Sequence, residues 1–147
     1  PGSITNTRIS ADDKVGIAVF TNALGGPAYK VLDRAFDWIA PAIAKAAKGE
    51  QGTEGQPEWR KLEGTYRALW NDSHVLTLEG KLVLVNPTAS NPKDGLMTLD
   101  PVGDGTFILT GANGGGAVGE PVVFELGADG RAQRMRVGVN WSDRVEY

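Results

Sequence analysis

The chain has 147 residues, a formal net charge of −3 and a hydrophobic fraction of 41%. This composition is that of a folded domain and not of a disordered chain, and the acidic balance argues against a generic nucleic-acid binder. Cysteine is absent and histidine occurs once, which excludes disulfide bonds, a thiolate nucleophile and a multi-histidine metal site. No apolar run is long enough to cross a bilayer. The sequence therefore predicts no metal, cofactor, nucleic-acid partner or membrane partner.

The first three residues, Pro1–Ser3, are typical of the remnant that remains when an affinity tag is cleaved. The sequence then continues at Ile4 without a methionine or a signal peptide, and we expect a piece of a longer protein. Because the start of that protein would be missing, the sequence predicts no cellular compartment.

A strand and a long helix are the first expected elements. The run Lys14–Thr21 is apolar without alternation and rich in β-branched residues, which predicts a strand buried on both faces. Apolar residues at three- and four-residue spacing predict a helix over Ala28–Lys48, closed by Gly49. Pro41 lies inside this pattern and should kink or end the helix near Ala40. The predicted apolar stripe of the helix consists of Val31, Leu32, Ala35, Phe36, Ile39 and Ile43.

A polar segment, Glu50–Pro57, separates this region from the rest of the chain and predicts a linker. Beyond it, apolar and polar residues alternate, which predicts an antiparallel meander with one solvated face. Seven or eight strands in roughly ninety residues would leave exposed edges unless the sheet closed. We therefore expect a mainly β fold, an up-and-down, lipocalin-like barrel over residues 58–147.

The strands of this barrel are expected between turn signals. A first strand contains Trp59, Leu62, Tyr66 and Leu69. The last strand is expected to place Met135, Val137, Val139 and Trp141 on one face. The remaining strands are Val75–Glu79, Lys81–Val85, Gly95–Asp100, Thr106–Thr110, Pro121–Leu126 and Gln133–Trp141, and the turns between some of them contain Gly80, Asp104-Gly105 and Asp129-Gly130.

One short pattern resembles a nucleophile motif. Ser90 and Lys93 have the S-x-x-K spacing, in which a lysine one helical turn away activates a serine. Here Asn91-Pro92 separates them, and this dipeptide is typical of a loop. We therefore expect a loop tip and no catalytic serine.

Asp72, Ser73 and His74 supply the residue types of a catalytic triad. They are adjacent in sequence, whereas a triad is assembled from distant parts of a fold because neighbouring side chains cannot align in hydrogen-bonded order. The favoured interpretation is a polar turn that leads into a strand at Val75.

The segment Gly111–Gly116 is rich in glycine but lacks the lysine and the serine or threonine of a phosphate-binding loop. A strand follows it where such a motif needs a helix. We expect a flexible loop at one mouth of the barrel.

Six aromatic residues are candidates to line a cavity, although core packing explains them as well because aromatic side chains dominate small β cores. Three arginines near the C-terminus, Arg131, Arg134 and Arg136, indicate a solvated strand face. The aromatic candidates are Trp59, Tyr66, Trp70, Phe107, Phe124 and Trp141.

The order of these features resembles one protein family. The segment Arg8–Ala23 is similar to the last strand of the central antiparallel sheet in serine β-lactamase-related hydrolases of the class C-like group, which includes esterases, D-aminopeptidases and penicillin-binding-protein-like peptidases. In that family a long helix follows, as expected over Ala28–Lys48, and many members carry a C-terminal lipocalin-like barrel. The segment Trp59–Tyr66 resembles the opening pattern of that barrel, W-x-x-L-x-G-x-Y. Further segments similar to its later strands are Gly119–Phe124, Asp129-Gly130 and Met135–Gly138.

The resemblance implies that residues 4–49 are the strand–helix end of a hydrolase domain, 50–57 a linker and 58–147 an accessory barrel that shapes substrate access or assembly. The family's S-x-x-K helix, Y-x-N loop and H-x-G or K-T-G strand have no counterpart here, so no catalytic residue is carried over. We expect this chain alone to be no enzyme. The expected partner is the missing hydrolase domain. Without it, the apolar surface of Lys14–Thr21 and Ala28–Lys48 is expected either to fold back on the barrel or to pair with a second copy.

Two alternatives remain open. The first is a stand-alone small barrel that binds an apolar small molecule in an open cavity lined by the six aromatic residues. A filled barrel interior would argue against it. The second is a catalytic barrel that uses Asp72, His74 and Arg136, and it requires a hydrolysis rate that His74→Ala abolishes.

Overall fold

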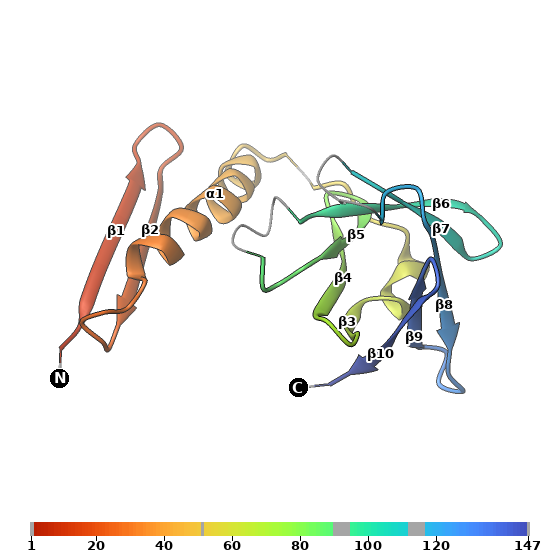
Figure 1. Ribbon diagram of the computed structural model, residues 1–147. Coiled ribbons are helices and arrows are strands. Elements are labelled where there is room, and N and C mark those ends of the chain that lie inside the picture. Colours follow the sequence, from red (N-terminus) through yellow and green to blue (C-terminus); the bar gives the residue numbers. More distant parts are fainter. Residues whose placement is uncertain (1, 51, 90–94, 112–116, 147) are drawn as a thin grey trace. The chain divides into compact units, whose positions relative to one another are not determined.

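The computed structural model describes residues 2–50, 52–89, 95–111 and 117–146 (Figure 1). The chain forms two compact units, Pro1–Gly52 and Thr53–Tyr147, and each is described by itself. The boundary lies within the segment predicted as a linker. Part of that segment belongs to the second unit, where Thr53 approaches Gly80 and Gly55 approaches Thr77 so closely that an added Cβ on either glycine would collide with the threonine.

The first unit is a two-stranded antiparallel sheet with one helix (Figure 1). Strand β1 (Ile4–Ser10) pairs with β2 (Val15–Thr21), so that Ile4 lies opposite Thr21 and Ser10 opposite Val15. The predicted strand is therefore present, but its partner β1 was not predicted because polar residues dominate it. Helix α1 (Ala28–Ala47) packs on one face of this hairpin.

The prediction that β2 is buried on both faces is wrong. Val15 is buried, whereas Gly16, Ala18 and Phe20 on the opposite face are exposed. The reason is that α1 covers one face of the sheet only. Figure 1 shows α1 alongside the hairpin.

Helix α1 continues through Pro41, so of the two expected outcomes near Ala40, a kink or an end, the end is wrong. A proline removes one backbone donor, and the residues that follow, Ala-Ile-Ala-Lys-Ala-Ala, have high helix propensity. The end at Gly49 is confirmed. Gly49 has a φ of 75° and donates to the Ala46 carbonyl, and the Glu50 N–H donates to the Lys45 carbonyl, each at 3.0 Å. These two bonds are those of a Schellman cap.

The second unit is a closed barrel of eight antiparallel strands in the order β10-β3-β4-β5-β6-β7-β8-β9. The predicted fold class, an up-and-down antiparallel barrel, is confirmed. A 3-10 helix, η1 (Pro57–Lys61), precedes it. The strands are β3 (Gly64–Arg67), β4 (Asp72–Leu78), β5 (Lys81–Val85), β6 (Met97–Gly103), β7 (Thr106–Thr110), β8 (Pro121–Leu126), β9 (Ala132–Val137) and β10 (Asn140–Val145).

Two expected hairpin turns are confirmed by their backbone conformation. Glu79 and Gly80, between β4 and β5, have φ values of 49° and 78°. Asp104 and Gly105, between β6 and β7, have φ values of 51° and 70°. Positive φ at both central residues is the type I′ conformation, whose twist matches that of the flanking strands.

Three predicted strand boundaries in the barrel are wrong. The first strand does not begin at Trp59, because Pro57 at the start of η1 favours a helical turn there. Strand β4 begins at Asp72, so Asp72, Ser73 and His74 are strand residues and not a turn. The expected last strand is two strands, because Gly138 with a φ of 57° forms a hairpin.

The hairpin at Gly138 also corrects the expected face of the last strand. Met135 is buried, but Val139 lies at the hairpin tip and is 85% exposed. Trp141 lies opposite Arg136 in the register of β9 and β10, next to the buried, inward-facing Ser142. Because successive side chains of a strand alternate between faces, Trp141 points outward.

The barrel interior contains one hydrophobic cluster, to which η1 and the strands β3 to β9 contribute. The largest fully buried side chains are Tyr66, Leu82, Leu99, Leu109, Met135, Val75 and Val122. Among the described residues, no helix combines the length and the apolar character that a membrane crossing requires.

Candidate functional site

Four of the six predicted aromatic candidates meet at one end of the barrel. Their rings form a chain of edge-to-face contacts, in which the ring centroids of Trp59 and Phe107 are 6.4 Å apart, those of Phe107 and Phe124 5.9 Å, and those of Phe124 and Tyr66 5.7 Å. Edge-to-face packing places the positive edge of one ring against the negative face of the next. The chain links η1 to strands β3, β7 and β8.

The other two candidates lie outside the barrel interior. Trp70 is 83% exposed at the tip of the β3–β4 hairpin, next to the equally exposed Leu69. Trp141 is on the outer face, where the guanidinium carbon of Arg134 lies 4.4 Å from its ring centroid. Arg134 also pairs with Asp143, with Nε and Oδ1 2.9 Å apart. This outer surface is the solvated arginine face that the sequence indicates.

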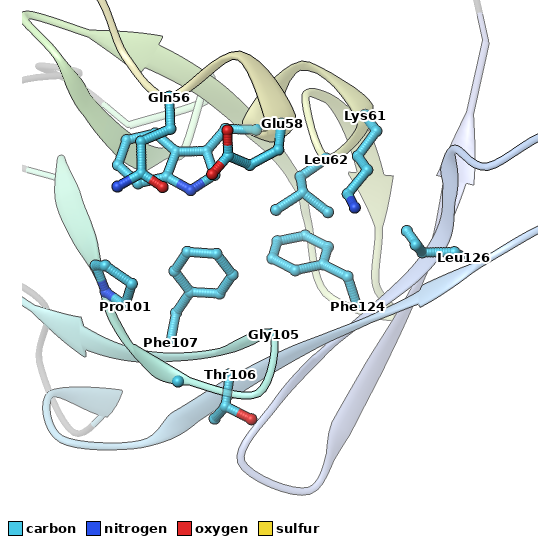
Figure 2. Close-up of a pocket in the computed structure, with 12 residues that line it drawn as sticks. Gln56, Glu58, Lys61, Leu62, Pro101, Gly105, Thr106, Phe107, Phe124 and Leu126 are labelled. Carbon is cyan, nitrogen blue, oxygen red and sulfur yellow. The ribbon is translucent and has the colours of Figure 1, made fainter.

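A pocket of about 280 Å³ opens beside the aromatic chain, between η1 and the β6–β7 hairpin. Figure 2 shows Phe107 and Phe124 pointing toward η1 from two neighbouring strands, with Leu62 above them and Leu126 at one side. Phe107 is buried, Phe124 is half-buried and Leu126 is 48% exposed. The lining residues are Gln56, Glu58, Trp59, Lys61, Leu62, Pro101, Gly103, Gly105, Thr106, Phe107, Phe124 and Leu126.

Hydrogen bonds fix the helix side of the pocket to the barrel. The Tyr66 hydroxyl donates to the Leu62 carbonyl at 2.6 Å, and Arg144 Nη2 donates to the Glu63 carbonyl at 2.6 Å. The Thr77 N–H donates to Glu63 Oε1 at 3.0 Å. Burial raises the pKa of Tyr66 to about 12, although the nearby Arg144 guanidinium opposes the shift. Tyr66 therefore stays protonated and keeps this bond throughout the neutral range.

The pattern W-x-x-L-x-G-x-Y has a structural explanation at each of its positions. Trp59 and Leu62 are buried in the core, and Tyr66 returns to the Leu62 carbonyl. Gly64 leaves room for Arg144, because a Cβ there would lie 2.8 Å from the guanidinium carbon. Arg144 uses this position to bridge the Glu63 and Ala132 carbonyls. The pattern thus attaches η1 and the segment after it to the barrel.

Two opposite charges stand at the edge of the pocket, Glu58 and Lys61. Side chains three residues apart on a 3-10 helix lie on the same side, because the helix has three residues per turn. Figure 2 shows both extending from η1, with Leu62 between them. Within the described part of the chain, neither takes part in a hydrogen bond or an ion pair.

The residues with the side-chain types of a catalytic triad, Asp72, Ser73 and His74, are not brought together in a catalytic arrangement. Asp72 and His74 share one face of β4, and Ser73 faces the other way. Asp72 is occupied by Arg67, whose Nε and Nη2 donate to its two oxygens at 2.9 and 3.0 Å. Arg136 is on β9, separated from β4 by β10 and β3. Arg136 is therefore three strand spacings away from β4 around the barrel wall, which amounts to about 14 Å.

Two further sequence candidates are not covered by the structure. Ser90 and Lys93 lie outside the described residues, as does most of the segment Gly111–Gly116. In the described ranges, no group of three or more histidine, aspartate or glutamate side chains is placed to hold a metal ion.

The N-terminal unit carries a different feature, an uncovered apolar face. Phe20 is 75% exposed and Ile9 is 72% exposed. Ile9 lies opposite Gly16, and Ala18 and Phe20 follow on the same face of β2, opposite Thr7 and Thr5 of β1. We call this face, with its apolar residues Ile9, Gly16, Ala18 and Phe20, the outer face of the hairpin.

The inner face of the hairpin is covered by α1. Arg8 extends from β1 to this helix, where its Nη1 lies 3.3 Å from Asp33 Oδ1 and its guanidinium stacks 4.4 Å from the Phe36 ring centroid. Leu32 is buried, but Val31, Ile39 and Ile43 of the predicted stripe are between 44% and 47% exposed. The helix thus also carries apolar surface that this unit does not cover.

Sequence reasoning missed the polar edge of the pocket and the role of Arg144. Charged residues beside a strand are common, so Glu58 and Lys61 give no distinctive signal. Arg144 is 81 residues from its partner Glu63, and only the closure of the barrel brings them together. The one usable signal was Gly64, because a glycine at a strand start can mark a close approach.

Searches against protein-family models and among curated proteins give no match for this sequence. The geometry therefore carries the functional argument.

Proposed function

We propose that this chain is the C-terminal part of a β-lactamase-related serine hydrolase of the esterase, peptidase or amidase type, and that it is non-catalytic. In this proposal Thr53–Tyr147 is an accessory barrel, and the unit before it is the end of the hydrolase sheet with the helix that covers it. The motif resemblance suggests the family, and the outer face of the hairpin supports the arrangement.

The observation that carries the proposal is the outer face of Ile9, Gly16, Ala18 and Phe20. Two-stranded sheets are marginally stable in water and gain stability from further strands and a second covering layer. Strand β2 is apolar on both faces, as in a sheet covered from both sides. A hydrolase domain that continues this sheet and covers its outer face accounts for both features.

The barrel has the properties expected of a non-catalytic accessory domain. Its inward side chains form one hydrophobic cluster, and its triad-type residues are separated or occupied. The loops of such a barrel can narrow a neighbouring cleft or hold copies of the enzyme together. The alternative, a free-standing module that binds an apolar small molecule in a cavity lined by the six aromatic residues, is supported by the pocket beside Trp59, Phe107 and Phe124. However, Trp70 and Trp141 lie outside that pocket.

Without its hydrolase domain, the N-terminal unit has apolar surface for which a second copy is the available cover. We expect the isolated chain to associate through β2 and α1. Phe20→Ser should then weaken this association in sedimentation experiments, whereas the equally exposed Val139→Ser at the barrel hairpin should not. Association that survives Phe20→Ser unchanged would contradict this part of the proposal.

The proposal is tested on the full-length gene product. We expect the codons before Ile4 to encode a helix-borne S-x-x-K and an H-x-G or K-T-G strand, and a serine-reactive fluorophosphonate to label that upstream serine. A label on a serine of this chain, or an upstream sequence without these motifs, would overturn the proposal. The serines of this chain are Ser3, Ser10, Ser73, Ser90 and Ser142.

The accessory role has its own test. Deleting Thr53–Tyr147 from the full-length enzyme should change its substrate selectivity or its oligomeric state. If both are unchanged while the deleted enzyme remains folded and active, the barrel has no accessory role.

A further inference from the structure

The pocket beside η1 has the shape and chemistry of a ligand site, and an inference from it does not depend on the proposed function. A dry cavity of about 150 Å³ is enough to hold benzene. The volume of about 280 Å³ found here suits a ligand group of one or two aromatic rings.

The lower wall of the pocket favours such a group. Phe107, Phe124 and Leu62 present apolar surface to it (Figure 2). Phe124 is only half-buried, so a ring placed against it would remove further apolar surface from water. Phe107 and Phe124 already contact each other, with ring centroids 5.9 Å apart, and also the rings of Trp59 and Tyr66, and a ligand ring would add a further aromatic contact on the side of them that lines the pocket.

The pocket is formed before any ligand binds. Tyr66, Arg144 and Thr77 hold the peptide segment Leu62–Glu63 through three hydrogen bonds, and Trp59 is anchored in the core. Binding to a preformed site is favoured because few side chains and loops have to be ordered when the ligand binds. The wall that carries Glu58 and Lys61 is thus in place.

The edge of the pocket offers one negative and one positive group on the same side of η1, with apolar Leu62 between them. Because no other described residue pairs with either charge, both can bind a ligand without breaking an ion pair. A ligand with a single charge would meet attraction from one and repulsion from the other. A ligand that carries both charges is attracted by both.

We propose that this pocket binds a small aryl zwitterion, a molecule with one or two aromatic rings that carries an ammonium group and a carboxylate. The rings lie against Phe107 and Phe124, the ammonium group pairs with Glu58, and the carboxylate pairs with Lys61. A free aromatic amino acid has this chemistry.

The test uses the whole chain and four probes: tryptophan, tryptamine, indole-3-propionate and indole. Titrations are followed by amide chemical shifts in ¹H–¹⁵N NMR spectra, with Leu62, Phe107 and Leu126 as reporters. Tryptophan should bind most tightly, and each lost charge should weaken binding by about two- to fivefold, the range expected for exposed ion pairs. Indole should bind most weakly.

Single-charge variants assign each contact. Glu58→Gln should weaken tryptophan and tryptamine but leave indole-3-propionate unchanged, because that probe has no ammonium group. Lys61→Met should weaken tryptophan and indole-3-propionate but leave tryptamine unchanged. Both residues are exposed, so these substitutions should not unfold the barrel.

A blocking variant locates the ring. Leu126→Trp fills the side of the pocket and should reduce the affinity for all four probes at least fivefold. Val102→Trp is its matched control, since Val102 is 60% exposed on β6, which β7 separates from the strand of Leu126, and is not among the residues that line the pocket. The proposal is overturned if tryptophan leaves the three reporter amides unshifted, if the probes bind equally, or if Leu126→Trp has no effect.

Discussion

The two units of the chain use apolar residues in contrasting ways. In the barrel the sheet closes on itself, so the inward side chains of every strand share one interior and Leu82, Leu99 and Leu109 become fully inaccessible. In the N-terminal unit a two-stranded sheet meets one helix, and Phe20 on its outer face remains 75% exposed. Both units contain apolar strands, but only the barrel supplies enough surface to cover them.

This contrast shows how the pattern of apolar residues in a strand indicates the number of faces that the folded protein buries. Alternation in β8 and β9 predicts one buried face, and the closed barrel provides it. Continuous apolar character in β2 predicts two buried faces, and the chain provides one. The uncovered face of β2 is the basis for proposing a further domain.

The largest expected difference between the units concerns their apolar side chains. Leu82→Ala should lower the free energy of unfolding of the barrel by about 2–5 kcal/mol, because it removes a fully buried side chain and leaves a cavity. Phe20→Ala should change stability by less than about 0.5 kcal/mol, since its side chain is mostly in water. Urea unfolding followed by near-ultraviolet circular dichroism measures both. Equal losses in the free energy of unfolding for Leu82→Ala and Phe20→Ala would contradict the difference between the two units.

Alkaline pH should act on the barrel through Tyr66. Its folded-state pKa of about 12 lies above the ordinary value of 10.0, so the unfolded chain loses this proton first. The contribution is fully present below pH 10 and is lost as pH rises to 12, by about 2–3 kcal/mol. Urea unfolding at a series of pH values should show this decline, and Tyr66→Phe should reduce it.

The control for this pH dependence is Tyr29→Phe in the N-terminal unit, where Tyr29 is exposed. That variant should retain the decline of the parent chain. If Tyr66→Phe also retains it in full, the buried hydroxyl is not the group that titrates.

A smaller effect is expected from adding one methyl group. Gly64→Ala should destabilise the barrel by about 1–3 kcal/mol, because its Cβ would displace the Arg144 guanidinium from the Glu63 and Ala132 carbonyls. Gly16→Ala in β2 is the matched change, and its nearest neighbour would be Ile9 Cγ1 at 3.6 Å, an ordinary contact. It should have little effect on thermal unfolding. A harmless Gly64→Ala would show that Arg144 can move freely.

The sequence predicts the barrel well because its signals are local. The Glu79-Gly80 and Asp104-Gly105 turns demand positive φ, and alternation fixes which face of β8 is buried. The hairpin at Gly138 was missed because Val139 and Trp141 continue the alternation of β9 across it. Strand β1 was missed because few of its residues are apolar, and its pairing with β2 is what makes it a strand.

The candidate site was predictable only in part. Trp59, Tyr66, Phe107 and Phe124 come together because all four are at inward positions or on the cap formed by η1. Trp70 does not join them, since it lies at a hairpin tip where no strand directs its side chain inward. The position of Glu58 and Lys61 on the same side of the pocket depends on η1, a helix that the strand-like pattern of this segment concealed.

Hydrogen–deuterium exchange of the dilute, monomeric chain tests most directly whether the first unit lacks its natural cover. Amides of β5 and β7 should exchange slowly, at rates set by global unfolding of the barrel, whereas amides of β1 and β2 should exchange at least a hundredfold faster through local opening. Equal protection of the hairpin and the barrel in the monomer would show that the first unit is complete as it stands, and would contradict the account.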